Sequence, residues 1–197
     1  EMCIRDSPGL NDRARSQVER IARATEEMQE LVKTFLMLAR AQRDEGAVAS
    51  RTTIREVGDE LIGVWRDTIE QKGLKLKYVV NATSSQLYNA TFLQSVMGNL
   101  LRNAAHYTDE GFIRLTLEAD GFMVEDSGVG IPEEQREAMF QPFVRGGEKR
   151  GEGLGLGLSL VQRICDDQGW VVSLTENQPN GCRFHVSLGD RGVAQDA

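Results

Sequence analysis

The stretch NLLRNAAHYT, residues 99–108, places two asparagines one turn apart in a helix that is otherwise strongly apolar. Its apolar face begins at Phe92 and Val96 and continues through Asn99 and Asn103, because residues four apart lie one above the other on a helix. A buried amide without a hydrogen-bond partner costs roughly 1–3 kcal/mol. The asparagine pair therefore predicts that this helix does more than fill a core.

The elements around this helix predict an α+β domain, a two-layer α/β sandwich with helices on one face of a mixed sheet. Apolar residues recur every three or four positions in the helical segments and every second position in the strands. The expected elements are a helix from 52 to 73, a strand at 74–80, the asparagine helix at about 90–106, a hairpin at 112–126 with its turn at Asp120-Gly121, a long loop, a helix at 157–169, and two strands within 170–188 around an Asn180-Gly181 turn.

A long helix is expected at residues 11–42, ahead of this domain. Its apolar seam advances in steps of three and four and consists of Val18, Ile21, Thr25, Met28, Val32, Phe35 and Ala39. Such a heptad pattern favours packing in a bundle of several helices, with docking onto its own domain as the alternative. Residues 1–7 resemble translated adaptor sequence, so the predicted division is a non-native leader at 1–7, the helix at 8–45, the α+β domain at 46–190 and a tail at 191–197.

Composition limits the partners. The chain of 197 residues has a net charge of −7, which argues against a nucleic-acid groove. Cys3, Cys165 and Cys182 have neither metal-site nor disulfide spacing, which favours a reducing compartment. No apolar run approaches the ~20 residues that a membrane span needs.

The segment EDSGVGIP, residues 125–132, follows directly on a predicted strand. The Asp126 carboxylate can accept a hydrogen bond from an exocyclic amine, and Gly128 and Gly130 let a flat ligand approach the backbone. A plain turn is the alternative.

The segment RGEGLGLGLSLV, residues 150–161, alternates glycines and then enters a helix. Backbone N–H groups in such a loop, together with a helix N-terminus, favour binding of phosphate. The spacing matches neither a dinucleotide fingerprint nor a Walker loop, and a flexible linker is the alternative. The preceding stretch AMFQPFVRGGEKRGEG, residues 138–153, carries Phe140 and Phe143 as expected aromatic anchors, with Arg145 and Arg150 as cations. It is interpreted as a lid over phosphates, with a solvated charged loop as the alternative.

Together, these segments indicate a nucleotide site in which the two asparagines bind a metal ion. Side-chain amide oxygens suit Mg²⁺, so Asn99 and Asn103 are predicted to hold this ion against nucleotide phosphates. Tyr107 is placed to lie on an adenine face. His106 is placed to contact phosphate, although a histidine at a helix end has an equally simple explanation in the helix dipole.

The segments NLLRNAAHYT, EDSGVGIP, MFQPFVRG and GEGLGLGLSLV resemble, in this order, the N, G1, F and G2 boxes of bacterial sensor histidine kinases, members of the Bergerat-fold ATPase superfamily. The resemblance covers about residues 8–189. It implies that the N-box asparagines bind Mg²⁺, the G1 aspartate contacts the adenine amine, and the G2 glycines and lid hold the phosphates of ATP. The ATP-binding residues so implied are Asn99, Asn103, His106, Tyr107, Asp126, Gly128, Gly130, Ile131, Phe143, Arg145, Arg150, Gly153, Leu154, Gly155, Leu156, Gly157 and Leu158.

The resemblance also implies an activity and partners: transfer of the ATP γ-phosphate to a histidine, then to an aspartate in a response-regulator receiver domain. It implies a homodimer formed through a helical hairpin, whose second helix is residues 8–45, in the cytoplasmic portion of an inner-membrane-anchored bacterial sensor. The family's H-E-x-x-x-P-like phosphoacceptor box is absent, since His106 belongs to the N box and His185 to the last strand. This chain is therefore predicted to bind ATP without phosphorylating itself.

Two other functions stay open. Hydrolytic Bergerat ATPases place a glutamate one turn before the magnesium asparagine, where this chain has Asn99, which cannot act as a base. A degenerate nucleotide-binding scaffold that works by dimerising is the non-enzymatic alternative.

Overall fold

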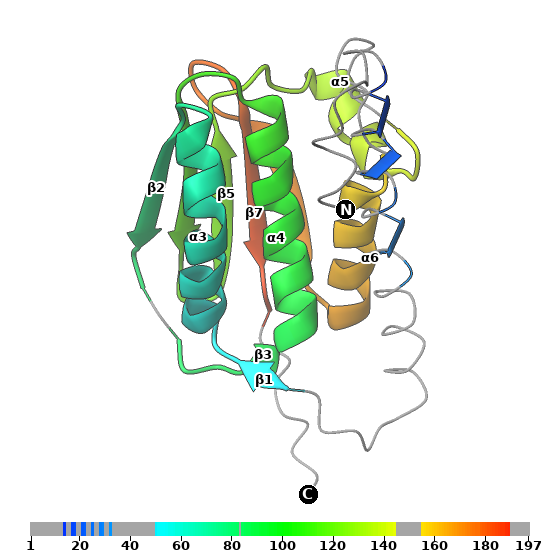
Figure 1. Cartoon of the computed structure of the whole chain (residues 1–197). Coiled ribbons are helices and arrows are strands. Elements are labelled where there is room, and N and C mark those ends of the chain that lie inside the picture. Colours follow the sequence, from blue (N-terminus) through cyan, green and yellow to red (C-terminus); the bar gives the residue numbers. More distant parts are fainter. Residues whose placement is uncertain are drawn as a thin grey trace, which may run out of the picture.

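The computed structural model describes residues 50–82, 84–144 and 155–189, together with the helical positions Ala14, Gln17, Val18, Ile21, Ala22, Thr25, Met28, Gln29 and Val32. The described domain has two layers, with α3, α4 and α6 on one face of a five-stranded sheet (Figure 1). The predicted α+β class with helices on one face of a mixed sheet is thereby confirmed.

The sheet has the strand order β2-β4-β5-β7-β6. Only the β2–β4 pair is parallel within this sheet, whereas β4–β5, β5–β7 and β7–β6 are antiparallel. A separate short pair joins β1 (Arg51–Thr52) to β3 (Tyr88–Asn89). The strands of the large sheet are β2 (Lys75–Val80), β4 (Phe112–Leu117), β5 (Gly121–Asp126), β6 (Val171–Glu176) and β7 (Cys182–Ser187).

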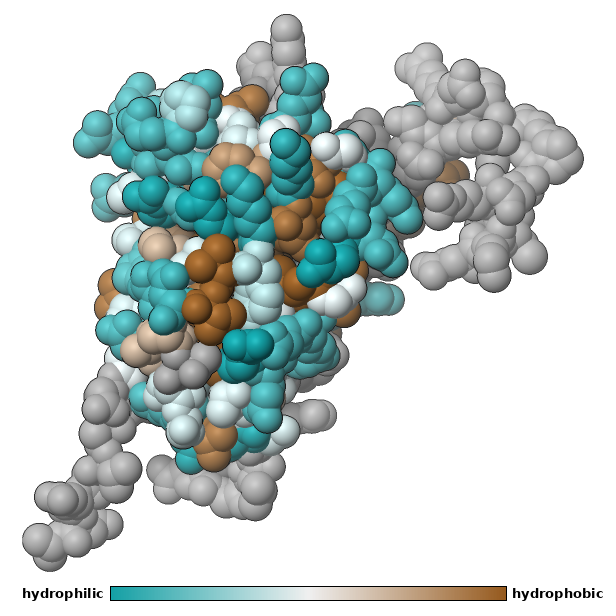
Figure 2. Space-filling model, turned by 90° about the vertical axis from the view of Figure 1, so that its left-hand side faces the viewer, coloured by the Kyte–Doolittle hydropathy of each residue, from teal (hydrophilic) through white to brown (hydrophobic). Residues whose placement is uncertain are grey.

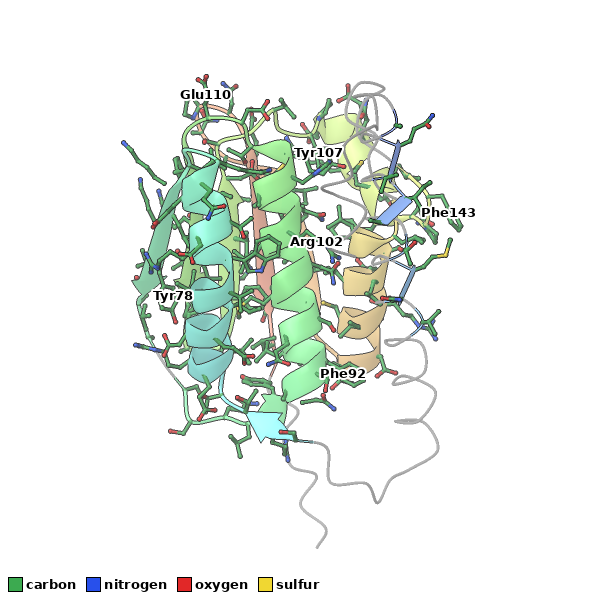
Figure 3. All side chains as sticks on the ribbon, in the orientation of Figure 1. Tyr78, Phe92, Arg102, Tyr107, Glu110 and Phe143 are labelled. Carbon is green, nitrogen blue, oxygen red and sulfur yellow. The ribbon has the colours of Figure 1, made fainter. Side chains whose placement is uncertain are left out.

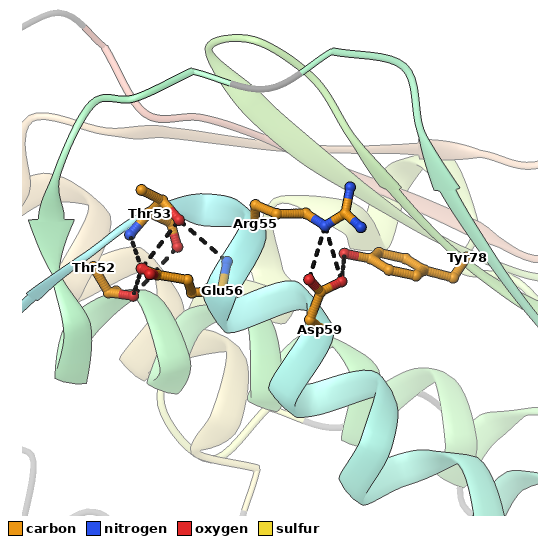
Figure 4. Close-up of polar contacts among 6 residues, drawn as sticks. All are labelled: Thr52, Thr53, Arg55, Glu56, Asp59 and Tyr78. Carbon is orange, nitrogen blue, oxygen red and sulfur yellow. Dashed lines mark hydrogen bonds and ion pairs between the residues drawn. The ribbon is translucent and has the colours of Figure 1, made fainter.

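Capping side chains and a left-handed glycine mark the ends of the helices. A capping box starts α3 (Ile54–Gln71): Thr53 Oγ1 accepts a hydrogen bond from the backbone N–H of Glu56, and the Glu56 carboxylate accepts one from the N–H of Thr53 (Figure 4). The Asn89 side chain caps the start of α4 (Ala90–Tyr107). Gly169, with a φ of 68°, ends α6 (Gly157–Gln168) in the left-handed conformation.

The central helix of the layer, α4, packs against both α3 and α6 and over β4 and β5. Its buried face carries Leu93, Val96, Met97, Leu100 and Leu101. The inward-facing residues of the strands, among them Leu115, Val124 and Phe184, share one face of adjacent strands through the register. The asparagine helix α4 therefore lies over the middle of the sheet. It carries both Asn99 and a large part of the hydrophobic core.

A polar contact joins α3 to the edge strand β2. Tyr78 Oη donates a hydrogen bond of 2.8 Å to Asp59, whose carboxylate also accepts two from the Arg55 Nε at 2.8 and 3.0 Å (Figure 4). Burial, together with the hydrogen bond to Asp59, raises the pKa of the Tyr78 phenol. A side chain on Gly58 would meet the phenol oxygen at 2.8 Å, so the glycine makes room for it.

Figure 2 shows the side of the molecule that carries β2 and α3, where apolar groups lie in strips between hydrophilic ones. Along β2, the exposed Lys75 and Lys77 alternate with the half-buried Leu76 and Tyr78. Lysines on an edge strand discourage pairing with another strand.

One turn differs from its prediction. In the β4–β5 hairpin, Leu117 pairs with Phe122, and the Glu118 N–H donates to the Gly121 carbonyl, so the turn centres on Ala119 and Asp120 and β5 already includes Gly121. Gly121 is needed for another reason, because a side chain there would lie 2.2 Å from the Val186 carbonyl oxygen of β7.

The predicted leader at 1–7 and tail at 191–197 lie outside the described residues. Within the predicted helix at 8–45, the described positions are helical, and Val18, Ile21, Met28 and Val32 of its seam are exposed. None of the helices described is both long and apolar enough to cross a membrane.

Candidate nucleotide-binding site

A cavity of about 300 Å³ lies where the C-terminal part of α4, the end of β5 and the first turn of α6 meet. Most of its lining is apolar, with polar groups at a few positions, as is usual for sites that bind a flat organic ligand. The lining residues are Asn103, Tyr107, Asp126, Val129, Gly130, Ile131, Pro132, Gln135, Met139, Leu158, Cys182 and Phe184. The structure therefore brings Asn103, Tyr107, Asp126, Gly130, Ile131 and Leu158 of the predicted set to one cavity.

Asp126 ends β5 and is only 4% exposed. Its Oδ1 accepts hydrogen bonds from the backbone N–H groups of Gly128 at 2.9 Å and Cys182 at 3.2 Å. Within the described part of the chain, nothing donates to Oδ2. Burial raises the pKa of this carboxyl, and the two N–H donors partly oppose that shift. One oxygen is thus fixed by the backbone, and the other is available to a ligand in the cavity.

Two residues that the sequence did not single out contact Asp126 at this end of the cavity. Asn177, which is buried, donates from Nδ2 to the Asp126 carbonyl at 2.7 Å. Cys182 lines the cavity, and burial raises the pKa of its thiol to about 12, so the group stays neutral. The only sequence signal near them was the turn at Asn180-Gly181.

The two glycines after Asp126 serve different purposes. A side chain on Gly128 would lie 2.4 Å from the Tyr107 carbonyl oxygen, so its absence allows the end of α4 to pack against this loop. Gly128 does not line the cavity, whereas Gly130 does and has a φ of 73°, which favours glycine. Close approach of a ligand thus accounts for Gly130 but not for Gly128.

The asparagine pair points at the start of α6. Asn99 is 2% exposed, and its Nδ2 donates to the Ser95 carbonyl at 2.7 Å. A side-chain carbon on Gly157 would lie 3.1 Å from Asn99 Oδ1 and 3.8 Å from Asn103 Oδ1. No hydrogen bond joins the Asn103 amide to any other described residue. Two amide oxygens thus converge on a space that a Cβ would fill, and this donor set fits a magnesium ion that also takes phosphate oxygens.

The start of α6 suits an anion. Within the described part of the chain, no side chain caps this helix at Leu156, so no capping side chain competes with a ligand for the N–H groups of its first turn. Free N–H groups and the helix dipole together attract phosphate. Gly155, just ahead, has a φ of 69°, and its carbonyl accepts a hydrogen bond from the N–H of Phe143 at 3.0 Å. The F-box and G2-box segments therefore meet beside the helix start.

The two expected aromatic anchors differ. Phe140, which ends the short helix η1 (Ala138–Phe140) after α5 (Glu133–Arg136), packs edge-to-face on Phe184 with the ring centroids 6.5 Å apart. Phe143 is 73% exposed (Figure 3), so its prediction as an anchor is wrong. Its φ of 67° turns the chain toward Gly155.

The remaining predicted residues lie around or beyond the cavity. His106, in the last turn of α4, makes an edge-to-face contact with the ring of Tyr107 and does not line the cavity. Arg102, which sequence reasoning missed, lies on the same helix as Tyr107 (Figure 3). Arg145, Arg150, Gly153 and Leu154 lie outside the described residues.

The fold and this cavity define an ATP-binding domain. The family model described as "Histidine kinase-, DNA gyrase B-, and HSP90-like ATPase" matches residues 88–191, slightly more than half of the chain, and the chain belongs to this family. Within it, the chain corresponds to the ATP-binding catalytic core of sensor histidine kinases.

Three comparisons show this relation. Sensor protein TorS of Escherichia coli K12 is 41% identical over 100 residues, which are 49% of this chain and 11% of TorS. Sensor histidine kinase CpxA of Escherichia coli K12 is 29% identical over 173 residues, which are 84% of this chain and 37% of CpxA. The solved catalytic domain of histidine kinase ThkA is 27% identical with a TM-score of 0.58, covering 70% of this chain and 94% of that domain. The chain thus spans well under half the length of these curated relatives.

Proposed function

We propose that this chain binds Mg·ATP and presents its γ-phosphate to a histidine, from which the phosphoryl group passes to an aspartate of a response-regulator receiver domain. The observation that supports this best is the arrangement of the cavity. The same apolar cavity is lined by the buried Asp126 carboxylate and by Asn103, whose Oδ1 lies close to Gly157 at the start of α6.

In this proposal, the adenine ring fills the apolar part of the cavity. The Asp126 Oδ2 accepts a hydrogen bond from the exocyclic amine, while Oδ1 stays fixed by the N–H groups of Gly128 and Cys182. Tyr107 covers a ring face from the end of α4. The phosphates then lie at the first turn of α6, where N–H groups and the helix dipole oppose their negative charge.

Asn99 and Asn103 are the residues that would hold the magnesium ion. When bound, the ion neutralises charge that develops on the phosphates during transfer. The two amide oxygens would position the ion next to the start of α6. The space for it exists because Gly157 has no side chain.

The acceptor histidine belongs to another helix in this proposal. The sequence has two histidines. His106 lies in the last turn of α4. His185 lies in the middle of β7, with its Nε2 3.3 Å from Glu118 Oε2. The exposed seam positions Ile21, Met28 and Val32 support pairing of the N-terminal helix with helices of a second copy. A cytoplasmic location follows from the need for ATP.

Calorimetric titration of the chain with ADP and ATP, with and without MgCl₂, tests the binding. We expect saturable binding that strengthens with Mg²⁺, and its absence from folded protein would overturn the proposal. Incubation with γ-labelled ATP should leave no acid-labile phosphate on this chain. A histidine-bearing first helix supplied in trans should become labelled.

Steady ATP turnover by the isolated chain would instead indicate a hydrolytic ATPase. The position that would carry the general base is Asn99, whose amide is already bonded to Ser95. We therefore expect turnover no faster than that of the Asp126→Asn variant. Binding of nucleotide with neither turnover nor labelling of any added helix would favour a scaffold.

A further inference from the structure

One cation already lies at the candidate metal site. Arg102, three residues after Asn99 on α4, donates a hydrogen bond from Nη2 to Asn99 Oδ1. The same Nη2 lies 3.9 Å from where a side-chain carbon on Gly157 would be. The guanidinium therefore occupies the region in which the two asparagine oxygens converge on the start of α6.

The Asn99 side chain can present only its Oδ1 to a metal, because its Nδ2 is held in a hydrogen bond within α4. Its Nδ2 donates to the Ser95 carbonyl at 2.7 Å inside α4, which leaves Oδ1 as the atom aimed at Gly157. Oδ1 is the atom that Arg102 contacts. Mg²⁺ and a guanidinium at neighbouring positions on one oxygen repel each other strongly in a partly buried site.

We propose that Arg102 occupies the position of the metal in the nucleotide-free state, where its guanidinium donates a hydrogen bond to Asn99 Oδ1. When Mg²⁺ binds with a nucleotide, the guanidinium leaves that oxygen. This inference rests on the proposed function. Arg102 keeps a buried amide oxygen bonded while the site is empty, and it makes binding of the metal a competition. The Mg²⁺ concentration at which nucleotide binding strengthens is thus set partly by this side chain.

The test compares wild type with Arg102→Met, which keeps an apolar stem and helix propensity but cannot donate to Asn99. Binding of ADP is titrated calorimetrically at a series of MgCl₂ concentrations and in EDTA. Arg163→Met, on the exposed face of α6, removes the same charge away from the site and serves as the control.

For Arg102→Met, we expect the Mg²⁺ concentration at half-maximal enhancement to fall about three- to tenfold, the range for loss of one partly solvated ionic contact. Affinity in EDTA should stay within about twofold of wild type, and Arg163→Met should match wild type throughout. Arg102→Lys, which keeps the charge, should lie between wild type and Arg102→Met. A purely structural role of Arg102 would move the thermal midpoint but not the Mg²⁺ dependence.

Two results would overturn this inference while leaving the proposed function intact. One is an unchanged or raised Mg²⁺ requirement in Arg102→Met. The other is an equal loss of ADP affinity with and without Mg²⁺, which would make Arg102 a phosphate ligand instead. If wild type bound no ADP under any condition, the proposed function would itself fail, and this inference with it.

Discussion

Replacing Asp126 with asparagine separates what this side chain does for binding from what it does for stability. In the native chain, Oδ1 accepts from the N–H groups of Gly128 and Cys182, at 2.9 and 3.2 Å. These two donors require an oxygen, so the new amide must place its NH₂ where Oδ2 was, facing the cavity. An adenine amine would then meet a donor instead of an acceptor.

The expected loss of affinity follows from this geometry. A hydrogen bond to a charged group contributes about 1.5–3 kcal/mol, and 1.4 kcal/mol corresponds to a factor of ten. We therefore expect Asp126→Asn to weaken ADP binding about 10- to 150-fold at neutral pH. The backbone around the site should be unchanged, because both N–H donors keep their acceptor.

The effect on stability should have the opposite sign. Burial raises the pKa of Asp126 in the folded state, so the native protein holds this proton more tightly than the unfolded chain does. Wild type therefore loses stability from this group as the pH rises above the ordinary aspartate pKa of about 3.9, until the folded-state pKa is passed. Asp126→Asn does not ionise, and its free energy of unfolding relative to wild type should increase across that window.

Calorimetry with Mg·ADP and urea unfolding between about pH 4.5 and 7.5 measure the two effects. Asp120→Asn, in the exposed turn at the other end of β5, is the matched control and should change neither. Affinity within threefold of wild type would refute the assignment of Asp126 to the adenine amine. A relative stability that falls with rising pH would refute the account of its burial.

Three further changes test other parts of the site. Asn103→Ala should weaken Mg²⁺-dependent ADP binding, measured as the ratio of affinities in Mg²⁺ and EDTA, far more than His106→Ala; equal losses would contradict the ligand assignment. Gly157→Ala should weaken Mg·ADP binding several-fold in the same titration, since its Cβ would lie 3.1 Å from Asn99 Oδ1, and unchanged affinity would argue against convergence there. Gly121→Ala should lower the free energy of unfolding by about 2–4 kcal/mol in urea, because its Cβ would lie 2.2 Å from a β7 carbonyl, and a neutral result would contradict that close packing.

The elements were predictable because their signals are local. Periodicity gave α3, α4 and α6, Gly73 marked the end of the first of these helices, and the strand pattern gave both hairpins. The cavity-lining role of Asn103 and Asp126 could be anticipated from the residue types, because each is polar at an apolar position.

The rest depends on contacts between distant segments. The N–H of Cys182 reaches Asp126 across 56 residues, and only the pairing of β5 with β7 brings it there. Phe143 belongs to an aromatic pair in sequence, yet its backbone is left-handed and its ring is exposed to solvent. A local sequence pattern predicts neither the register between strands nor the backbone torsion of a single residue.

The asparagine pair itself shows how one helix serves both a core and a site. Asn99 is buried and bonded at both ends of its amide, to Ser95 and to Arg102, so its burial carries little penalty without a ligand. Asn103 borders the cavity, so water can satisfy its amide at low cost until a ligand arrives. The deeper residue thus needs an internal partner and the shallower one does not. This difference is consistent with the arginine between them, which donates to Asn99 Oδ1 and not to Asn103.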